Sequence, residues 1–161
     1  MALLEELGGD NMKNQLIDQL FSCVEDPNAE DLWLNLLKDY QCKYGKVEDV
    51  RDSETQWTLL HYAAENLFVR VAEWLIEQGS EIDALDLKGN TPFLIGLDAA
   101  IDYAVQENNN EIDFSIITLL LSKGANEDLI SNDGTDKDAL LKAYGSNAAN
   151  QYKAKVKGGR P

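Results

Sequence analysis

The sequence has one histidine, two cysteines and no long apolar run, and each scarcity excludes a class of function. A single histidine, His61, excludes catalytic sites that need two imidazole groups. Cys23 and Cys42 lack the spacing of a metal-binding motif, so reduced thiols are the simplest interpretation. A helix that crosses a bilayer needs about 20 apolar residues. No segment meets this requirement, and we therefore expect no membrane span.

The first residues also lack the features of a secretory signal. Residues 1–7 (MALLEEL) carry acidic side chains where a signal would have an apolar core, and no basic residue precedes them. This composition predicts a cytoplasmic protein. Export as a bacterial effector is left open.

Basic residues are scarce, with 14 Lys and Arg against 29 Asp and Glu, which gives a net charge of −15. The imbalance is uneven, because residues 1–138 carry −20 and all five charged residues after Asp138 are basic. Such an acidic body repels phosphate backbones and steers basic partners toward itself, so we expect no nucleic-acid binding through it. The alternative is that the acidic residues only keep the protein in solution.

A short motif occurs twice at a fixed distance. The sequence of residues 58–64 (TLLHYAA) recurs in diverged form at residues 91–97 (TPFLIGL), 33 residues later. Self-similarity at a period of 20–50 residues is typical of helical repeats that stack on one another. The period therefore predicts a solenoid, in which each repeat needs its neighbours to bury its apolar face.

Residues 58–64 carry most of the T-P-L-H-x-A string of ankyrin repeats, and residues 79–84 (GSEIDA) follow the exit of such a repeat. The chain resembles the ankyrin-repeat family over about residues 52–130. This resemblance implies an all-α solenoid of paired antiparallel helices joined by loops or β-hairpin-like turns. It also implies that His61 makes a structural hydrogen bond across the repeat interface.

The second repeat departs from the family in length. It carries twelve extra residues between its two helices, around the Asn-rich residues 106–113. Apolar residues continue at helical spacing through Ala104, so we expect the first helix to run about two turns longer. The apolar residues 116–121 predict a deeply buried second helix. In the first repeat, Leu59 replaces the usual proline.

These patterns predict one domain over residues 1–161. Residues 1–50 form an N-terminal cap of two helices, at 12–24 and 30–43. Residues 51–131 form the two repeats, residues 132–148 a C-terminal capping helix, and residues 149–161 a flexible basic tail.

The resemblance implies that loop tips and the inner ends of the first helices contact a protein partner. Trp57 also suits packing against the N-terminal cap, since that cap has no ordinary repeat face. The insertion tip, residues 107–111, either extends this surface or serves as a polar spacer. The positions carried over from the family are Glu54, Thr55, Trp57, Tyr62, Glu65, Asn66, Leu87, Lys88, Asn90, Ile95 and Asp98.

The leading functional interpretation is a non-enzymatic module, monomeric when free, that binds a protein with a basic surface as an adaptor or host-mimicking effector. A dedicated inhibitor, such as an immunity protein that masks a basic toxin or nuclease, is the alternative. A metal-dependent enzyme using Glu48, Asp49, Asp52 and Glu54 is disfavoured, because their spacing fits no calcium-binding loop. We expect no cofactor and no metal.

Overall fold

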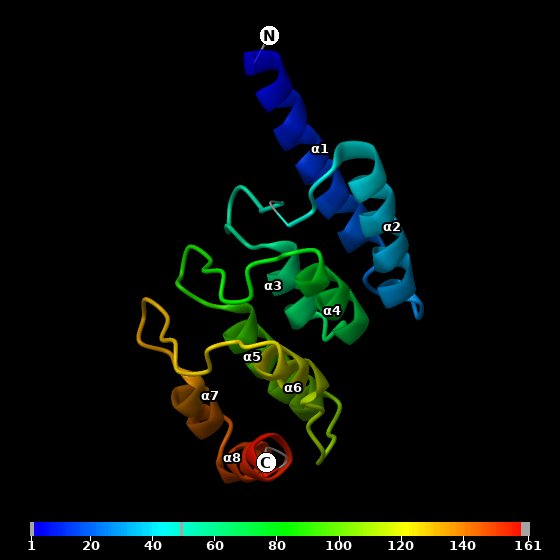
Figure 1. The fold of residues 1–161 in the computed structure, drawn as a ribbon. Helices are drawn as coiled ribbons and strands as arrows, with labels where there is room; N and C mark the ends of the chain where they lie inside the picture. Colours follow the sequence, from blue (N-terminus) through cyan, green and yellow to red (C-terminus); the bar gives the residue numbers. More distant parts are fainter. Residues whose placement is uncertain (1, 49, 159–161) are drawn as a thin grey trace.

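The computed structural model describes residues 2–48 and 50–158, which form a stack of helix pairs (Figure 1). Within these residues there are α-helices, one π-helix and a single isolated β-bridge, between Arg51 and Thr58. The expected all-α solenoid is therefore confirmed. The helices are α1 (Ala2–Ser22), α2 (Ala29–Tyr44), α3 (Leu59–Glu65), α4 (Val69–Glu77), α5 (Pro92–Gln106), α6 (Ser115–Ser122), α7 (Lys137–Ala143), α8 (Ser146–Tyr152) and the π-helix η1 (Lys153–Lys157).

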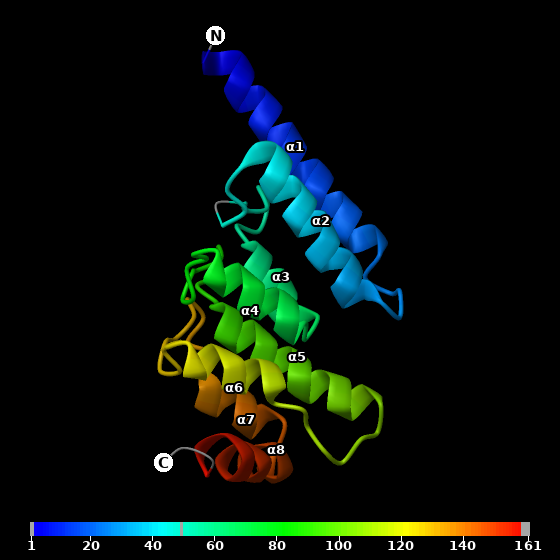
Figure 2. The ribbon, with the colours of Figure 1, turned by 45° about the vertical axis from the view of Figure 1, so that its right-hand side comes forward.

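The pairs follow one another along the stack, with α1 and α2 at one end and α7 and α8 at the other (Figures 1 and 2). The first helices of successive pairs contact each other, α3 against α5 and α5 against α7. The second helices α4 and α6 also contact each other. This arrangement buries the apolar face of each pair against its neighbours, as the solenoid principle requires.

The same capping geometry begins three inner helices. Thr58, Thr91 and Asp136 have extended backbone, and each side-chain oxygen accepts a hydrogen bond from the amide three residues on. Such a cap satisfies one of the amides that a helix start leaves without a partner. Asp136 lies 45 residues after Thr91, which is the 33-residue period plus the twelve inserted residues. The repeat register therefore continues into a third helix pair.

The loops before these helices are tight hairpin-like turns that are joined to one another. The Leu87 amide donates to the Thr55 carbonyl at 3.0 Å. One repeat later, the Asn132 amide donates to the Lys88 carbonyl at 2.8 Å. These two bonds connect three successive loop tips, which lie on one side of the stack (Figure 1).

Each turn needs a left-handed residue two positions before its cap. Gly89 and Gly134 fill this position in the second and third turns, at φ 77° and 86°. Gln56 fills it in the first turn at φ 61°, where a side chain costs conformational energy. Gly89 has a second constraint, since an added Cβ would lie 3.0 Å from the Asn132 amide nitrogen. The loop-to-loop bonds thus require glycine there.

The N-terminal pair, α1 and α2, is attached to the repeats through Glu30, whose carboxylate caps the start of α4. The Glu30 carboxylate on α2 accepts the Arg70 amide at 2.6 Å, at the start of α4, where a helix favours negative charge. The Arg70 guanidinium returns to Glu30 at 3.0 Å and to Asp31 at 2.8 Å. Trp33 is buried and its ring meets Phe68 edge-on at 5.2 Å. Trp33 thus packs the N-terminal pair against the start of the repeats.

The insertion lengthens α5 and then returns to the stack. α5 has 15 residues where α3 has seven, so the expected two-turn extension is confirmed. The return is fixed to the C-terminal helices, because the Gln151 side chain binds the Ile112 amide at 3.0 Å and the Asn110 carbonyl at 2.6 Å. Lys155 also donates to the Ile112 carbonyl at 3.1 Å.

The helix after the insertion is less buried than its sequence suggests. Ile116, Ile117 and Leu120 are buried, but Leu119 and Leu121 remain half-buried. The expectation of an evenly buried helix was wrong, because α6 is an outer helix and contacts its neighbours along one face.

The expected flexible tail from residue 149 is helical in the structure as far as residue 157, and residues 159–161 lie outside the description. Ala148, Tyr152 and Val156 are all buried, and they follow one another at the four-residue spacing of one helix face. The Tyr152 ring meets Phe114 at 5.7 Å. Basic composition suggested a free end, but this apolar stripe holds the segment against the stack.

His61 lies at the centre of the repeat contact and is fully buried. Its Nδ1 accepts the Thr58 amide at 3.1 Å, so the proton of the neutral ring is on Nε2. Nε2 then donates to the Asn90 carbonyl in the next loop, at 3.1 Å. The hydrogen bond across the repeat interface is where the resemblance placed it. Burial lowers the pKa of His61 below its usual value.

We expect His61→Phe to lower the free energy of unfolding by about 2–3 kcal/mol, because the Thr58 amide and the Asn90 carbonyl lose a buried partner. The His61 pKa is lower in the folded protein, so the wild type loses stability as the pH falls through about 6.5, where the unfolded chain takes up a proton. Urea titrations at pH 7 and pH 5 should therefore show a smaller gap at pH 5. A gap that is equal at both pH values would contradict this interpretation.

Candidate protein-binding surface

The loop tips present several of the predicted contact residues to solvent. Glu54, Leu87 and Lys88 are exposed, and the Leu87 side chain is 62% exposed although it is apolar. Thr55 is also exposed, and its carbonyl accepts the Leu87 amide. The loop-to-loop bonds hold these side chains on one ordered edge of the stack.

Trp57 and Tyr62 instead take part in packing. The Trp57 indole donates to Asp86 at 3.0 Å, and its ring stacks on His61 and meets Tyr62 at 5.0 Å. Tyr62 is buried and donates to Asp52 at 3.1 Å. Burial and the Asp52 charge raise the pKa of Tyr62 to about 12. The cluster therefore joins the first repeat to the next loop, with little of Tyr62 left for a partner.

Three further predicted residues are half-buried. The Asn66 side chain donates to the Tyr62 carbonyl at 2.8 Å at the end of α3. The Asn90 side chain donates to Asp86 at 3.1 Å within the second loop. Ile95 lies on α5 with part of its side chain accessible. Both asparagines thus shape their turns, and Ile95 adds a small apolar contact area.

Carboxylates from adjacent inner helices come together. Glu65 at the end of α3 and Asp98 on α5 are one repeat period apart, and Asp102 lies one turn further along α5. Burial raises the pKa of Glu65, and the charges of Asp98 and Asp102 raise it further. Asp98 accepts the Tyr144 hydroxyl at 2.9 Å from the end of α7. We call Glu65, Asp98 and Asp102 the acidic row.

A hollow of about 440 Å³ lies beside the acidic row, between the end of α1, the α3–α4 turn and the extension of α5. Glu65 and Asp102 supply its charge, and Leu67 takes a left-handed backbone at φ 57° in the turn. Tyr103 stands at its edge, 60% exposed. The lining consists of Val24, Glu65, Asn66, Leu67, Phe68, Ala99, Asp102, Tyr103 and Gln106. The arrangement combines apolar contact area with negative charge.

The carboxylates proposed for a metal site do not assemble in the described part of the chain, where no cluster of three or more metal-ligating side chains occurs. Asp52 accepts the amides of Glu54 and Thr55, both at 2.8 Å, and so closes a turn. Although burial opposes it, these bonds and the Tyr62 hydroxyl lower the pKa of Asp52. Asp49 lies outside the described residues.

Sequence reasoning missed two members of this surface, Asp102 and Tyr144. Asp102 follows Asp98 by four residues, which is one turn on the same face of a helix. Because the apolar pattern predicts that α5 continues past Leu97, this spacing could have placed Asp102 beside Asp98. Tyr144 gave no such signal, because the third helix pair matches the repeat pattern too weakly to set its register.

The family model of the ankyrin repeat matches residues 55–87, which span α3, α4 and the following loop. Residues 55–87 therefore match an ankyrin repeat, and the all-helical stack around them is consistent with an ankyrin solenoid. No curated protein matches the chain. Within the described residues no helix is both long and apolar enough to cross a membrane.

Replacing Glu65 with glutamine should raise the melting temperature at pH 7. The pKa of Glu65 is higher in the folded protein, so its ionised form opposes folding at neutral pH, and that cost disappears as the pH falls below about 4.3. Calorimetry should show the gain at pH 7 and its loss near pH 4. Glu77→Gln, on the exposed outer helix α4, is the matched control. An equal gain in the control would contradict a specific effect of the acidic row.

Proposed function

We propose that this chain is a non-enzymatic binding module, monomeric when free, that captures a protein partner with a basic surface. Ankyrin repeats indicate protein–protein interaction, and the family match places one at residues 55–87. The partner would contact the acidic row and the exposed loop tips. The net charge of −15 would attract it over a distance and make association sensitive to salt.

The acidic row is the single observation that supports this proposal most. Glu65 and Asp98 lie one repeat period apart on the contacting helices α3 and α5, with Asp102 one turn further on. Burial raises the pKa of Glu65, and the charges of Asp98 and Asp102 raise it further. Like charges held together in this way cost free energy in the unbound protein. Lysine or arginine side chains of a partner would neutralise these charges. Removal of the repulsion between the carboxylates would then make the free energy of binding more favourable.

The surface around the acidic row suits an extended contact. The hollow beside Asp102 offers apolar lining for the stem of a long basic side chain, which packs against apolar area while its charge meets a carboxylate. Along the loop tips, Leu87 adds apolar area and Glu54 adds another negative charge. The exposed insertion tip, residues 107–111, continues from the end of α5.

Two biological roles use the same surface. An adaptor or host-mimicking effector would join the partner to other proteins. A dedicated inhibitor would cover a basic toxin or nuclease, and the acidic row favours this role where the partner's active site is itself basic. An activity assay of the captured partner separates them, since only the inhibitor abolishes that activity at a 1:1 ratio.

We expect Asp98→Asn with Asp102→Asn to weaken partner binding by about 2- to 10-fold, mainly through slower association. Asparagine at residue 98 can still accept the Tyr144 hydroxyl, so the fold should be retained. The immobilised chain would capture proteins from its source cells at low salt, and surface plasmon resonance would compare the variants with the captured partner.

The matched control is Glu77→Gln with Asp39→Asn, which removes the same charge from exposed positions on α4 and α2. Only the first variant should lose affinity and show a weaker dependence on salt. Equal losses in both variants, or no basic protein retained at low salt, would overturn the proposal.

A further inference from the structure

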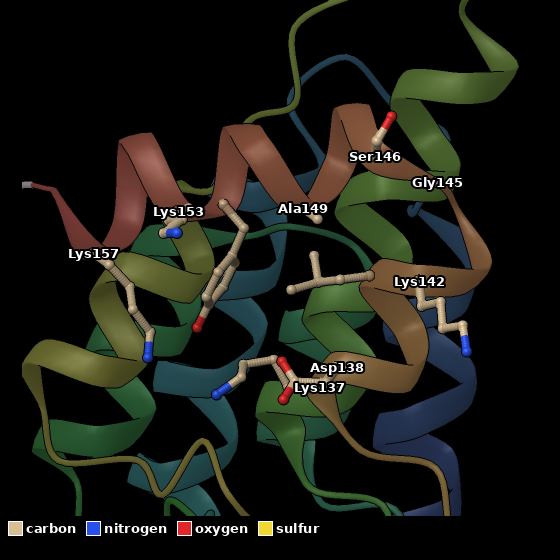
Figure 3. A pocket seen from close by; sticks show the side chains of 10 residues that line it. Lys137, Asp138, Lys142, Gly145, Ser146, Ala149, Lys153 and Lys157 are labelled. Atoms are coloured by element: carbon tan, nitrogen blue, oxygen red, sulfur yellow. The ribbon is translucent and has the colours of Figure 1, made fainter.

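A second hollow lies at the C-terminal end of the stack, between α7 and the helix formed by α8 and η1 (Figure 3). Its volume is about 520 Å³, within the range of sites that hold small organic molecules. It shares no residue with the hollow beside the acidic row. We call it the lysine pocket, and its lining is Lys137, Asp138, Leu141, Lys142, Gly145, Ser146, Ala149, Tyr152, Lys153 and Lys157.

The walls of the lysine pocket are held by one carboxylate behind them. Glu127, in the loop after α6, accepts Lys137 at 3.0 Å and the Tyr152 hydroxyl at 2.7 Å. Lys157 lies 3.6 Å from its other oxygen. Burial alone would raise the pKa of Glu127, but these donors lower it. Because α7, α8 and η1 meet at this side chain, the pocket has a fixed shape without a ligand.

The interior of the lysine pocket is apolar. Leu141 and Tyr152 are almost completely buried, and Ala149 lies half-buried between them in sequence. Gly145, at φ 91°, makes the sharp turn that folds α8 back over α7. Figure 3 shows the helix that carries Ala149 and Lys153 on one side of the hollow and the helix that carries Asp138 and Lys142 on the other. Of these three side chains, Ala149 keeps accessible apolar area, whereas Leu141 and Tyr152 expose only 6% and 3% of their surface.

The rim carries positive charge in an otherwise acidic chain. Four lysines line the pocket and one carboxylate, Asp138, accompanies them. Lys137 pairs with Glu127 and Asp128, and Lys157 lies 3.6 Å from Glu127 with half of its side chain exposed. Lys142 and Lys153 are exposed and form no ion pair within the described residues. Lys153 and Lys157 lie one turn apart along η1 (Figure 3). An anionic group at this edge would meet two ammonium groups at once.

We propose that the lysine pocket binds a small amphipathic anion, with its carboxylate or phosphate at Lys153 and Lys157 and its apolar body over Ala149 and the aliphatic stems of the lining lysines. A polyanion such as nucleic acid would fit less well, because the rest of the chain repels it. The pocket is concave and partly apolar, so a bare inorganic anion would use only its rim. This inference does not depend on the proposed partner at the acidic row.

The test is a titration of the ¹⁵N-labelled protein, followed by NMR, with octyl phosphate, decanoate, inorganic phosphate and neutral 1-octanol. Octyl phosphate or decanoate should shift the amides of Leu141, Ala149 and Tyr152 saturably at a 1:1 ratio, and the stronger of the two identifies the head group. Inorganic phosphate and octanol should bind at least about tenfold more weakly, since each meets only half of the site. Equal binding of octanol would overturn the proposal, as would shifts spread over all exposed lysines.

Two variants separate the charge from the apolar body. Lys153→Gln with Lys157→Gln should weaken binding at least about fivefold, whereas Lys38→Gln with Lys43→Gln, which removes the same charge from α2, should not. Ala149→Leu should block the pocket without changing its charge. Circular dichroism checks that each variant is folded. Unchanged affinity in the first variant or in Ala149→Leu would contradict the assigned site.

Discussion

The structure depends on one buried, neutral imidazole. His61 satisfies the start of its own helix through Thr58 and reaches the next repeat through the Asn90 carbonyl. The Nδ1 bond needs the ring uncharged, with its proton on Nε2, and burial favours that state. If the ring were charged, Nε2 could still donate to the Asn90 carbonyl, but Nδ1 could no longer accept the Thr58 amide. The start of α3, next to the repeat contact, thus depends on the protonation state of one side chain.

The starts of the first two inner helices could be predicted, because the same short motif occurs at both positions. Thr58 and Thr91 marked two helix starts, because a threonine cap before an apolar helix has a direct physical meaning. The third pair was harder to predict, since Asp136 caps its first helix without the rest of the motif. Ala148, Tyr152 and Val156 gave a helical stripe, but the surrounding lysines and glycines suggested a flexible end. The basic residues of this segment indicate only what its exposed face is like. They do not reveal the apolar face that packs against the stack.

The candidate site could be predicted only in outline. Positions carried over from the family located Glu65 and Asp98 on adjacent helices, yet Trp57 stacks on His61 and Tyr62 packs against Trp57. A tryptophan in a loop suits either role, and only its hydrogen bond to Asp86 in the next loop distinguishes them. The acidic row and the lysine pocket are two separate sites of opposite charge on the stack. Neither could be located from composition, because each is assembled by stacking.

The most direct test of this account is the protonation of His61, measured by ¹H–¹⁵N NMR of the imidazole ring as a function of pH. Since the chain has one histidine, the signals need no assignment among candidates. The account predicts a neutral ring with its proton on Nε2, slow exchange of that proton, and a titration midpoint below the usual value of about 6.5. A ring that titrates near pH 6.5 with a rapidly exchanging proton would contradict it, since such a ring would be neither buried nor bonded to the Thr58 amide.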